Sequence, residues 1–162
     1  VGSEMCIRDS GTDALMLSLK CLGIQEGDEV ITTPYTFYAT IGAIVTAGAI
    51  PIFVDVDEDY NIDTKKIQQK ITKKTKAILP VHWSGRVCNM QEILKISKKY
   101  KIPVVEDSCH GILAKYNNQV AGSFGEFGCF SLHPLKNLNV WGDGGFVAVS
   151  YTHLTLPTTP YV

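Results

Sequence analysis

The chain has 162 residues, of which 45% are hydrophobic and 19% charged, so its length predicts one domain with one compact core. These proportions are those of an ordinary globular protein and exclude a disordered tail, a collagen-like rod and a coiled coil. Fifteen Lys and Arg against sixteen Asp and Glu leave a formal charge of -1, which excludes a general basic surface for nucleic acid or anionic lipid. We therefore expect a small-molecule ligand, with no nucleic acid and no membrane as partner.

The two ends of the chain differ from its middle. The chain does not begin with Met, and Val1–Asp9 show neither helical nor strand periodicity, while residues 150–162 are rich in Thr and Pro. Both end strings resemble translated sequencing-adapter read-through. We predict that residues 1–10 and 150–162 are non-native segments on either side of a native domain at 11–149, with Ser10 and Ser150 at the junctions.

Between these ends, strands and helices alternate. Hydrophobic patterns and end signals predict, in chain order, a helix at 13–22, a strand at 30–32, a helix at 36–47, a strand at 50–56, a helix at 64–71 capped by Asp63, a strand at 77–81, a helix at 90–100 capped by Asn89, a strand at 103–106, a hairpin at 115–120, and strands at 127–132 and 145–149. This alternation predicts the α/β class, as a three-layer α/β/α domain with a mostly parallel sheet and helices on both faces. Groups that act on a ligand should then gather at the carboxyl ends of the strands.

The five cysteines form no C-x-x-C motif and no even framework, so we expect reduced, inert thiols in a cytoplasmic protein. The spacing of His82, Cys88, Cys109 and His110 matches no standard zinc pattern, and we expect no metal. The apolar stretch 39–54 is too short to span a bilayer and contains a glycine and a proline; it predicts a buried helix followed by a buried strand. No signal peptide is recognisable at the N-terminus.

Three polar clusters fall at the ends of predicted elements. Gly11-Thr12 offers backbone amides, a hydroxyl and a helix N-terminus to a phosphate, although it also suits an ordinary cap. Glu106-Asp107 ends a strand, and a carboxylate pair near a core is costly unless it binds something. Lys136 lies in an apolar loop before the glycines of 142–145, so it is either a carbonyl nucleophile or a surface lysine in a turn. The Gly-rich segment 122–128 lacks dinucleotide and Walker spacing, so neither of those nucleotide-binding folds is supported.

Seven motifs occur in an order that resembles one known family. They are GTDAL at 11–15, GDEVITTPYTFYAT at 27–40, IPIFVDVD at 50–57, TKAILPVHWSGR at 75–86, VVEDSCHG at 104–111, GSFGEFGCFSLHPLKNL at 122–138 and GDGG at 142–145. Together they resemble the DegT-type family of pyridoxal-phosphate-dependent nucleotide-sugar aminotransferases over residues 11–149. The resemblance implies the aspartate aminotransferase fold, with this chain as an incomplete large domain of the fold type I PLP-dependent transferases.

The resemblance also implies a cofactor, pyridoxal 5'-phosphate, and a role for seven residues around it. Lys136 would be the Schiff-base lysine that also shuttles the substrate proton, and Asp107 would pair with the pyridine nitrogen. Phe37 matches the aromatic that stacks on the ring, and His110 matches a position near the ring face that is Gln or His in such proteins; both residues could instead pack in a core. The phosphate-holding positions are matched by Gly11, Thr12 and Ser131.

The activity that the resemblance implies is transfer of an amino group from L-glutamate to a nucleotide-linked keto-sugar, in amino-sugar, cell-surface polysaccharide or secondary-metabolite biosynthesis. The full-length protein would be a homodimer. One alternative is a PLP-dependent sugar dehydratase of the same fold, in which His replaces the lysine; Lys136 argues against it, and His133 is three residues too early. Another alternative is a truncated non-catalytic fragment, because family chains are more than twice as long and add an N-terminal stretch and a small C-terminal domain.

Overall fold

The computed structural model describes residues 3–150, so all but Ser150 of the predicted non-native segment at 150–162 lies outside the described residues. The elements in chain order are β1 (Ser3–Arg8), α1 (Gly11–Cys21), β2 (Glu29–Thr32), α2 (Tyr38–Thr46), β3 (Ile50–Phe53), α3 (Thr64–Lys70), β4 (Thr75–Ile78), the 3-10 turn η1 (Trp83–Gly85), α4 (Met90–Tyr100), β5 (Val105–Asp107), β6 (Lys115–Tyr116), β7 (Gln119–Val120), β8 (Phe127–Ser131) and β9 (Gly145–Ser150). Every predicted helix and strand is present, with ends shifted by a few residues.

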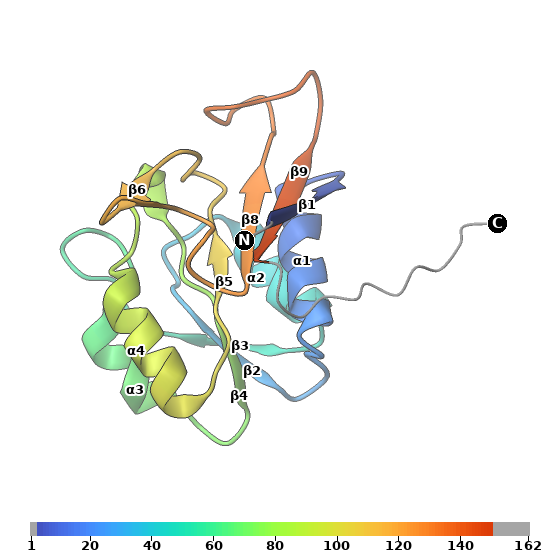
Figure 1. The fold of residues 1–162 in the computed structure, drawn as a ribbon. Coiled ribbons are helices and arrows are strands. Elements are labelled where there is room, and N and C mark those ends of the chain that lie inside the picture. Colours follow the sequence, from blue (N-terminus) through green and yellow to red (C-terminus); the bar gives the residue numbers. More distant parts are fainter. Residues whose placement is uncertain (1–2, 151–162) are drawn as a thin grey trace.

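The strands other than the β6-β7 hairpin follow the order β3-β2-β4-β5-β8-β9-β1 across the molecule (Figure 1). Parallel ladders join β3, β2 and β4, and another joins β5 to β8. Two isolated parallel bridges, Ile78 with Val104 and Val81 with Asp107, connect β4 to β5. Among these strands of the described chain, only β9 runs antiparallel to its neighbours β8 and β1. The prediction of a mostly parallel sheet is confirmed, with β9 as its antiparallel member.

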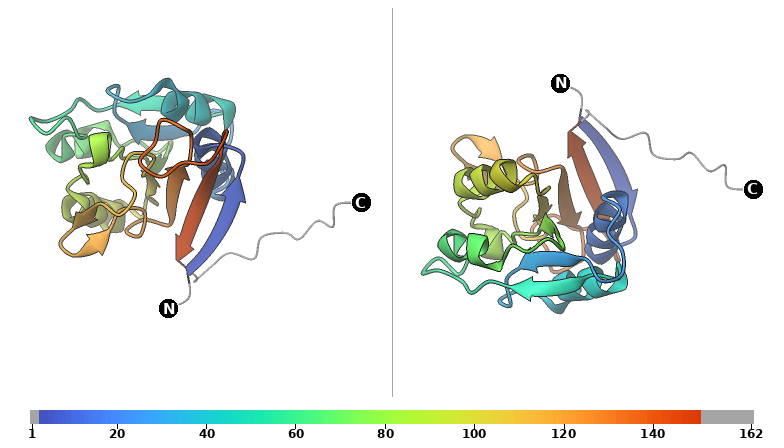
Figure 2. Two further views of the ribbon diagram at one scale, coloured as in Figure 1. Left: turned by 90° about the horizontal axis from the view of Figure 1, so that it is seen from above. Right: turned by 90° about the horizontal axis from the view of Figure 1, so that it is seen from below.

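Helices cover both faces of the sheet, which gives the predicted three layers. In Figure 1, α3 and α4 lie to the left of the sheet and α1 to the right, and Figure 2 shows the same separation from above and below. Successive strand residues point to opposite faces, so Val30 packs with α1 and α2 while Ile31 packs with α3 and α4. The expected single core is therefore two apolar clusters, one on each side of the sheet.

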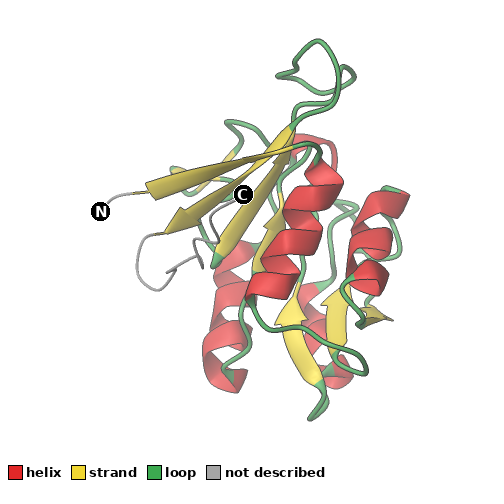
Figure 3. Ribbon diagram, turned by 90° about the vertical axis from the view of Figure 1, so that its right-hand side faces the viewer, coloured by secondary structure: helices red, strands yellow, loops and turns green. Residues whose placement is uncertain are grey.

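Local signals account for the ends of the helices and for the hairpin. Ser10, Asp63 and Asn89 cap α1, α3 and α4, and each side chain accepts a backbone amide from the first turn of its helix. Asn117 and Asn118 both have positive φ, 48° and 64°, as a tight turn between β6 and β7 requires. Figure 3 shows how the helices stack beside the strands that they connect.

The two edge strands depart from the expectations. Val1–Asp9 were expected to lack strand structure, but Ser3–Arg8 form β1, because β9 pairs with its backbone and an edge strand needs no apolar alternation; Met5 and Ile7 are exposed. That the residues 1–10 are non-native stays a prediction. At the other edge, β3 was expected to be buried, yet Ile50 and Phe53 are about half exposed. Only β2 pairs with β3, so its outer side has no neighbour within the described residues.

Candidate active site

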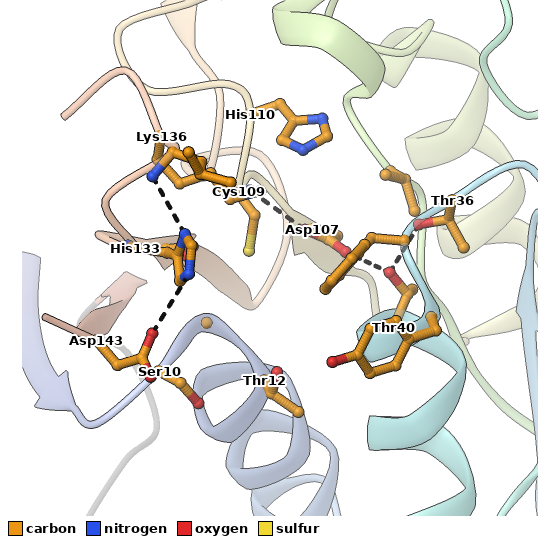
Figure 4. Close-up of a pocket in the computed structure, with 16 residues that line it drawn as sticks. Ser10, Thr12, Thr36, Thr40, Asp107, Cys109, His110, His133, Lys136 and Asp143 are labelled. Carbon is orange, nitrogen blue, oxygen red and sulfur yellow. Dashed lines mark hydrogen bonds and ion pairs between the residues drawn. The ribbon is translucent and has the colours of Figure 1, made fainter. Parts of the chain in front are cut away.

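A cavity of about 450 Å³ lies where β5 and β8 end and where α1 and α2 begin (Figure 4). This is the edge of a parallel sheet at which ligands commonly bind. All seven residues predicted for the site line this cavity, namely Gly11, Thr12, Phe37, Asp107, His110, Ser131 and Lys136. The structure thus brings together positions that are up to 125 residues apart in sequence, while the role of each residue stays a prediction.

The first turn of α1 forms one end of the cavity. The hydroxyl of Ser10 accepts the amide of Asp13 at 3.1 Å, and within residues 3–150 the structure gives the amides of Gly11 and Thr12 no protein partner. A Cβ on Gly11 would lie 2.7 Å from Cβ of Ser131 and 2.9 Å from Sγ of Cys109. Only glycine therefore fits at the start of this helix, where backbone amides and the helix dipole favour an anion.

Asp107 lies at the end of β5 and is 5% exposed. Its Oδ2 accepts the hydroxyl proton of Thr40 at 2.8 Å, and its Oδ1 accepts the amide of Cys109 at 3.2 Å. These two donors fix the plane of the carboxylate and leave lone pairs on both oxygens. A buried carboxylate held in this way can accept an N–H from a ligand in the cavity.

Lys136 and Phe37 face each other across the cavity. Nζ of Lys136 lies 5.9 Å from the centroid of the Phe37 ring, and the amide of Lys136 donates to the carbonyl of His133 in a turn after β8. Phe37 is the N-cap residue of α2 and is 53% exposed, so its ring is not part of either core. A planar ligand can stack on this ring while remaining within reach of the lysine amine.

Burial lowers the pKa of His110, the charge of Lys136 lowers it further, and the charge of Asp107 opposes both effects. The ring of His110 packs edge-on against Trp83, with centroids 5.1 Å apart, and its Nδ1 accepts the amide of Ser84 at 3.4 Å. His110 is therefore a neutral imidazole at neutral pH, and it contributes an uncharged ring to the wall of the cavity.

Of the carboxylate pair Glu106-Asp107, only Asp107 lines the cavity. Glu106 is fully buried, and its oxygens accept the amides of Gly122, Phe124 and Gly125 at 2.7–2.8 Å. Its Oε2 also lies 2.9 Å from Nε2 of His82. Because neighbouring residues of a strand point to opposite faces, Glu106 holds a protein loop while Asp107 faces the cavity.

The residues considered for a zinc site have other partners. Nδ1 of His82 accepts the amide of Cys88, and the thiol of Cys88 donates to a backbone carbonyl. Within residues 3–150, no three His, Cys, Asp or Glu side chains gather closely enough to hold a metal ion. All five cysteines are free thiols; two are buried, Cys6 and Cys109 are half-buried, and Cys21 is exposed. Burial and the charge of Asp107 raise the pKa of Cys109, which keeps this thiol protonated.

Nine further residues line the cavity that the sequence analysis did not assign to the site. They are Ser10, Thr36, Tyr38, Thr40, Val81, Cys109, His133, Leu135 and Asp143. A signal existed for two of them, because Thr36 and Thr40 are four residues apart in the helix predicted at 36–47, and residues with this spacing share one helix face. In the structure α2 begins at Tyr38, so Thr36 lies just before the N-cap residue Phe37. The others depend on how loops meet around the cavity.

The three layers and the pocket at the carboxyl edge of the sheet define an α/β domain with a small-molecule site. Residues 1–155 match the model of the DegT/DnrJ/EryC1/StrS aminotransferase family, and the chain belongs to this family. The resemblance seen in the seven motifs is confirmed, as is the partial type I fold.

Individual relatives agree with this assignment. The chain is 45% identical over 139 residues to "Pleiotropic regulatory protein" of Geobacillus stearothermophilus, covering 85% of this chain and 37% of that protein. It is 47% identical over 146 residues to UDP-N-acetyl-3-dehydro-alpha-D-glucosamine 3-aminotransferase of Acidithiobacillus ferrooxidans, covering 90% and 40%. The crystal structure of NtdA from Bacillus subtilis with bound cofactor PMP matches with a TM-score of 0.84 at 40% identity, covering 90% of this chain and 33% of that one. The chain thus spans about two fifths of the length of the curated relatives it matches.

The residues around the cavity fit pyridoxal 5'-phosphate, the cofactor of this family. The cradle at Gly11 has the amide donors that a phosphate needs and would be filled by any side chain. Asp107 supplies a buried acceptor and Lys136 a primary amine on the walls of the same cavity. A volume of about 450 Å³ also lies within the range of about 300–1,000 Å³ that is usual for small-molecule sites.

Proposed function

We propose that the full-length protein is a pyridoxal-phosphate-dependent aminotransferase that moves an amino group from L-glutamate to a nucleotide-linked keto-sugar. The observation that carries this proposal is a single cavity in which a lysine amine, a buried carboxylate and a helix N-terminus come together. The Acidithiobacillus relative is named as an aminotransferase of a UDP-linked 3-dehydro sugar, which supports the substrate class. The Bacillus subtilis spore coat polysaccharide biosynthesis protein SpsC, 42% identical, supports a place in the biosynthesis of cell-surface polysaccharides.

Each residue of the cavity has a defined task in this proposal. When bound, pyridoxal phosphate supplies an electron sink for the carbon that loses or gains the amino group. Nζ of Lys136 would hold the cofactor covalently and, when displaced by the incoming amine, would move the proton at the substrate carbon. Asp107 would keep a proton on the pyridine nitrogen, and Phe37 and His110 would flank the ring. The phosphate would be held by Gly11, Thr12 and Ser131.

Two substitutions in the full-length protein test these tasks. We expect Lys136→Ala to abolish transamination without unfolding the protein, and Asp107→Asn to retain the cofactor but lose nearly all turnover. The measurement is the formation of amino-sugar from glutamate and a UDP-linked 3-keto-sugar, followed by mass spectrometry. Lys95→Ala, which removes only an exposed ion pair with Glu92, is the matched control and should keep the wild-type rate. If either site variant retained turnover, the role proposed for that residue would be wrong.

The dehydratase alternative is less well supported than amino transfer. That branch of the fold has His in place of the lysine, whereas here the lysine itself lines the cavity. His133 also lines the cavity, but its Nε2 lies 3.8 Å from the carboxylate of Asp143 and its carbonyl is bonded to the Lys136 amide. His133 therefore borders the lysine turn and does not replace the lysine.

We further propose that the protein acts in the cytoplasm as a homodimer, without a membrane or nucleic-acid partner. Within the described residues no helix is both long and apolar enough to cross a membrane. The loop between β8 and β9, at the top of Figure 1, exposes Leu135, Leu138 and Trp141 beside the cavity, with exposed fractions of 88%, 53% and 107%. A second copy of the full-length chain would cover this apolar surface.

A further inference from the structure

Behind Asp107 lies a short chain of hydroxyl groups that the roles given above do not use. Oγ1 of Thr36 lies 2.7 Å from Oγ1 of Thr40, and Oγ1 of Thr40 lies 2.8 Å from Oδ2 of Asp107 (Figure 4). Thr40 is 1% exposed and Asp107 is 5% exposed, so the hydrogen bond between them lies away from bulk water, while the bond from Thr36 is partly buried. Bonds of this kind are electrostatically stronger than in water and costly to break.

The direction of the protons in this chain follows from chemistry. A carboxylate oxygen only accepts, so the single hydroxyl proton of Thr40 is given to Asp107. Thr40 can then only accept from its other neighbour, so the hydroxyl of Thr36 donates to it. The result is a directed chain, Thr36 to Thr40 to Asp107, in which each donor polarises the next.

The structure of α2 explains why this chain is placed well for Asp107. Phe37 is the N-cap residue of α2, and Thr40 lies in its first turn, so the aromatic ring and the hydroxyl are set by the same rigid element. The side chain of Asp107 is held from the other side by the amide of Cys109, at 3.2 Å from Oδ1. Losing the Thr40 bond would leave one carboxylate oxygen without its protein donor and the carboxylate free to rotate.

We propose that Thr40, polarised by Thr36, is a positioning residue that orients the carboxylate of Asp107 toward the pyridine nitrogen of the cofactor. This proposal rests on the proposed function, because it gives Asp107 the pyridine nitrogen as its ligand. Thr40 lines the cavity, but its hydroxyl proton is committed to Asp107, so it acts through that carboxylate and not on the substrate.

The test uses four variants of the full-length protein loaded with pyridoxal phosphate. Thr40→Val keeps the shape and removes the hydroxyl, Thr40→Ser keeps the hydroxyl, and Thr36→Val removes only the outer donor. Thr46→Val, at the exposed end of the same helix, is the matched control. The readouts are the pH titration of the absorbance of the bound cofactor, the dissociation constant of the cofactor, and kcat.

For Thr40→Val we expect the ring nitrogen of the bound cofactor to lose its proton at lower pH, because a misoriented carboxylate holds the ring proton less well. We also expect kcat to fall by about tenfold to a hundredfold, the size expected for a lost hydrogen bond to a charged group. Thr36→Val should move both readouts in the same direction by less, and Thr40→Ser should recover most of the loss. Thr46→Val should behave as wild type.

Two results would overturn the proposal. One is a Thr40→Val protein whose titration and kcat match wild type; the other is a Thr40→Ser protein as impaired as Thr40→Val, which would mean that packing and not the hydroxyl matters. If Thr40→Val does not fold, Thr36→Val tests the proposal with the same readouts, because Thr36 is only half-buried; a Thr36→Val protein that matches wild type would then overturn it. A failure of the proposed function would look different, since the wild-type protein itself would then bind no pyridoxal phosphate at Lys136.

Discussion

Glu106 and Asp107 are adjacent carboxylates on one strand, and their surroundings give them different tasks. Three loop amides and the ring of His82 take up the oxygens of Glu106, so nothing is left for a ligand. Asp107 has only one described donor on each oxygen and faces the cavity. The number of protein donors around each buried carboxylate therefore distinguishes Glu106, which is structural, from Asp107, which keeps lone pairs for the proposed cofactor.

His110 gives the protein a pH dependence with a definite sign. Its folded-state pKa lies below 6.5, so the unfolded chain binds a proton more readily, and the free energy of unfolding falls as the pH drops below 6.5. The stability contributed by neutral His110 is fully present above that pH. We expect His110→Gln to lose less stability than wild type between neutral and mildly acidic pH. Urea unfolding of both proteins on either side of pH 6.5 measures this, and parallel curves would contradict the role given to His110.

At the scale of elements, Glu106 ties the segment between β7 and β8 to the middle of the sheet. Glu106→Ala would leave the amides of Gly122, Phe124 and Gly125 and the ring of His82 without their acceptor. We expect it to lower the free energy of unfolding by about 3–5 kcal/mol, as removal of one partner from a buried charged network does.

The control for the buried Glu106 is a glutamate that lies on the surface, Glu92. Glu92 pairs with Lys95 on an exposed face of α4, so Glu92→Ala should cost less than about 1 kcal/mol. Chemical denaturation of the two variants gives the comparison. Equal losses would mean that the loop amides find other acceptors and that Glu106 does not hold the segment.

Two glycines in different elements should respond in opposite ways to the same substitution. A Cβ on Gly128 in β8 would overlap the backbone of Gly122, whereas a Cβ on Gly42 in α2 meets no atom within 4 Å. We expect Gly128→Ala to destabilise the protein by about 3 kcal/mol, since backbone must move. Gly42→Ala should stabilise it by up to about 1 kcal/mol, because alanine is the better helix former. Thermal unfolding checks both signs, and a stable Gly128→Ala protein would contradict the close approach of β8 to the segment before it.

At the scale of the whole molecule, the site depends on the order of the sheet. The central strands β5 and β8 bring Asp107 and Ser131 to one edge, and the first turns of α1 and α2 reach that edge from one face. The antiparallel β9 begins at the same edge, where Gly145 approaches the carbonyl of Ser10 so closely that a Cβ would lie 2.5 Å away. The cavity is thus lined by residues from segments that are far apart in the sequence, from Ser10 to Asp143.

The exposed loop beside the cavity predicts the behaviour of the assembled protein. In the full-length chain we expect the double variant Leu138→Lys and Trp141→Lys to sediment as a monomer, because both apolar side chains would be buried in a dimer. Leu113→Lys is the matched control, since Leu113 is 82% exposed but lies in the segment between β5 and β6, outside this loop, and this variant should remain dimeric. A double variant that stays dimeric, or a monomeric wild type, would contradict the proposed homodimer.

Local signals in the sequence were enough to predict much of this fold. The caps Asp63 and Asn89 and the Asn117-Asn118 turn act within a few residues, so their helices and hairpin are where they were expected. The position of the site was also predictable, because the topology of a parallel sheet sends strand ends to one edge. The donors around Glu106 and the link from Thr40 to Asp107 were not, because each joins segments that only tertiary packing brings together. The strand β1 was missed for the same reason.

The most direct measurement is to reduce the full-length protein with borohydride in the presence of pyridoxal phosphate and to map the modified peptide. We predict one pyridoxyl group, on Lys136. The Lys136→Ala protein should carry none, and the surface lysines should stay unmodified in both proteins. A folded full-length protein that carries no adduct, or carries it on another lysine, would contradict the assignment of this cavity as the cofactor site.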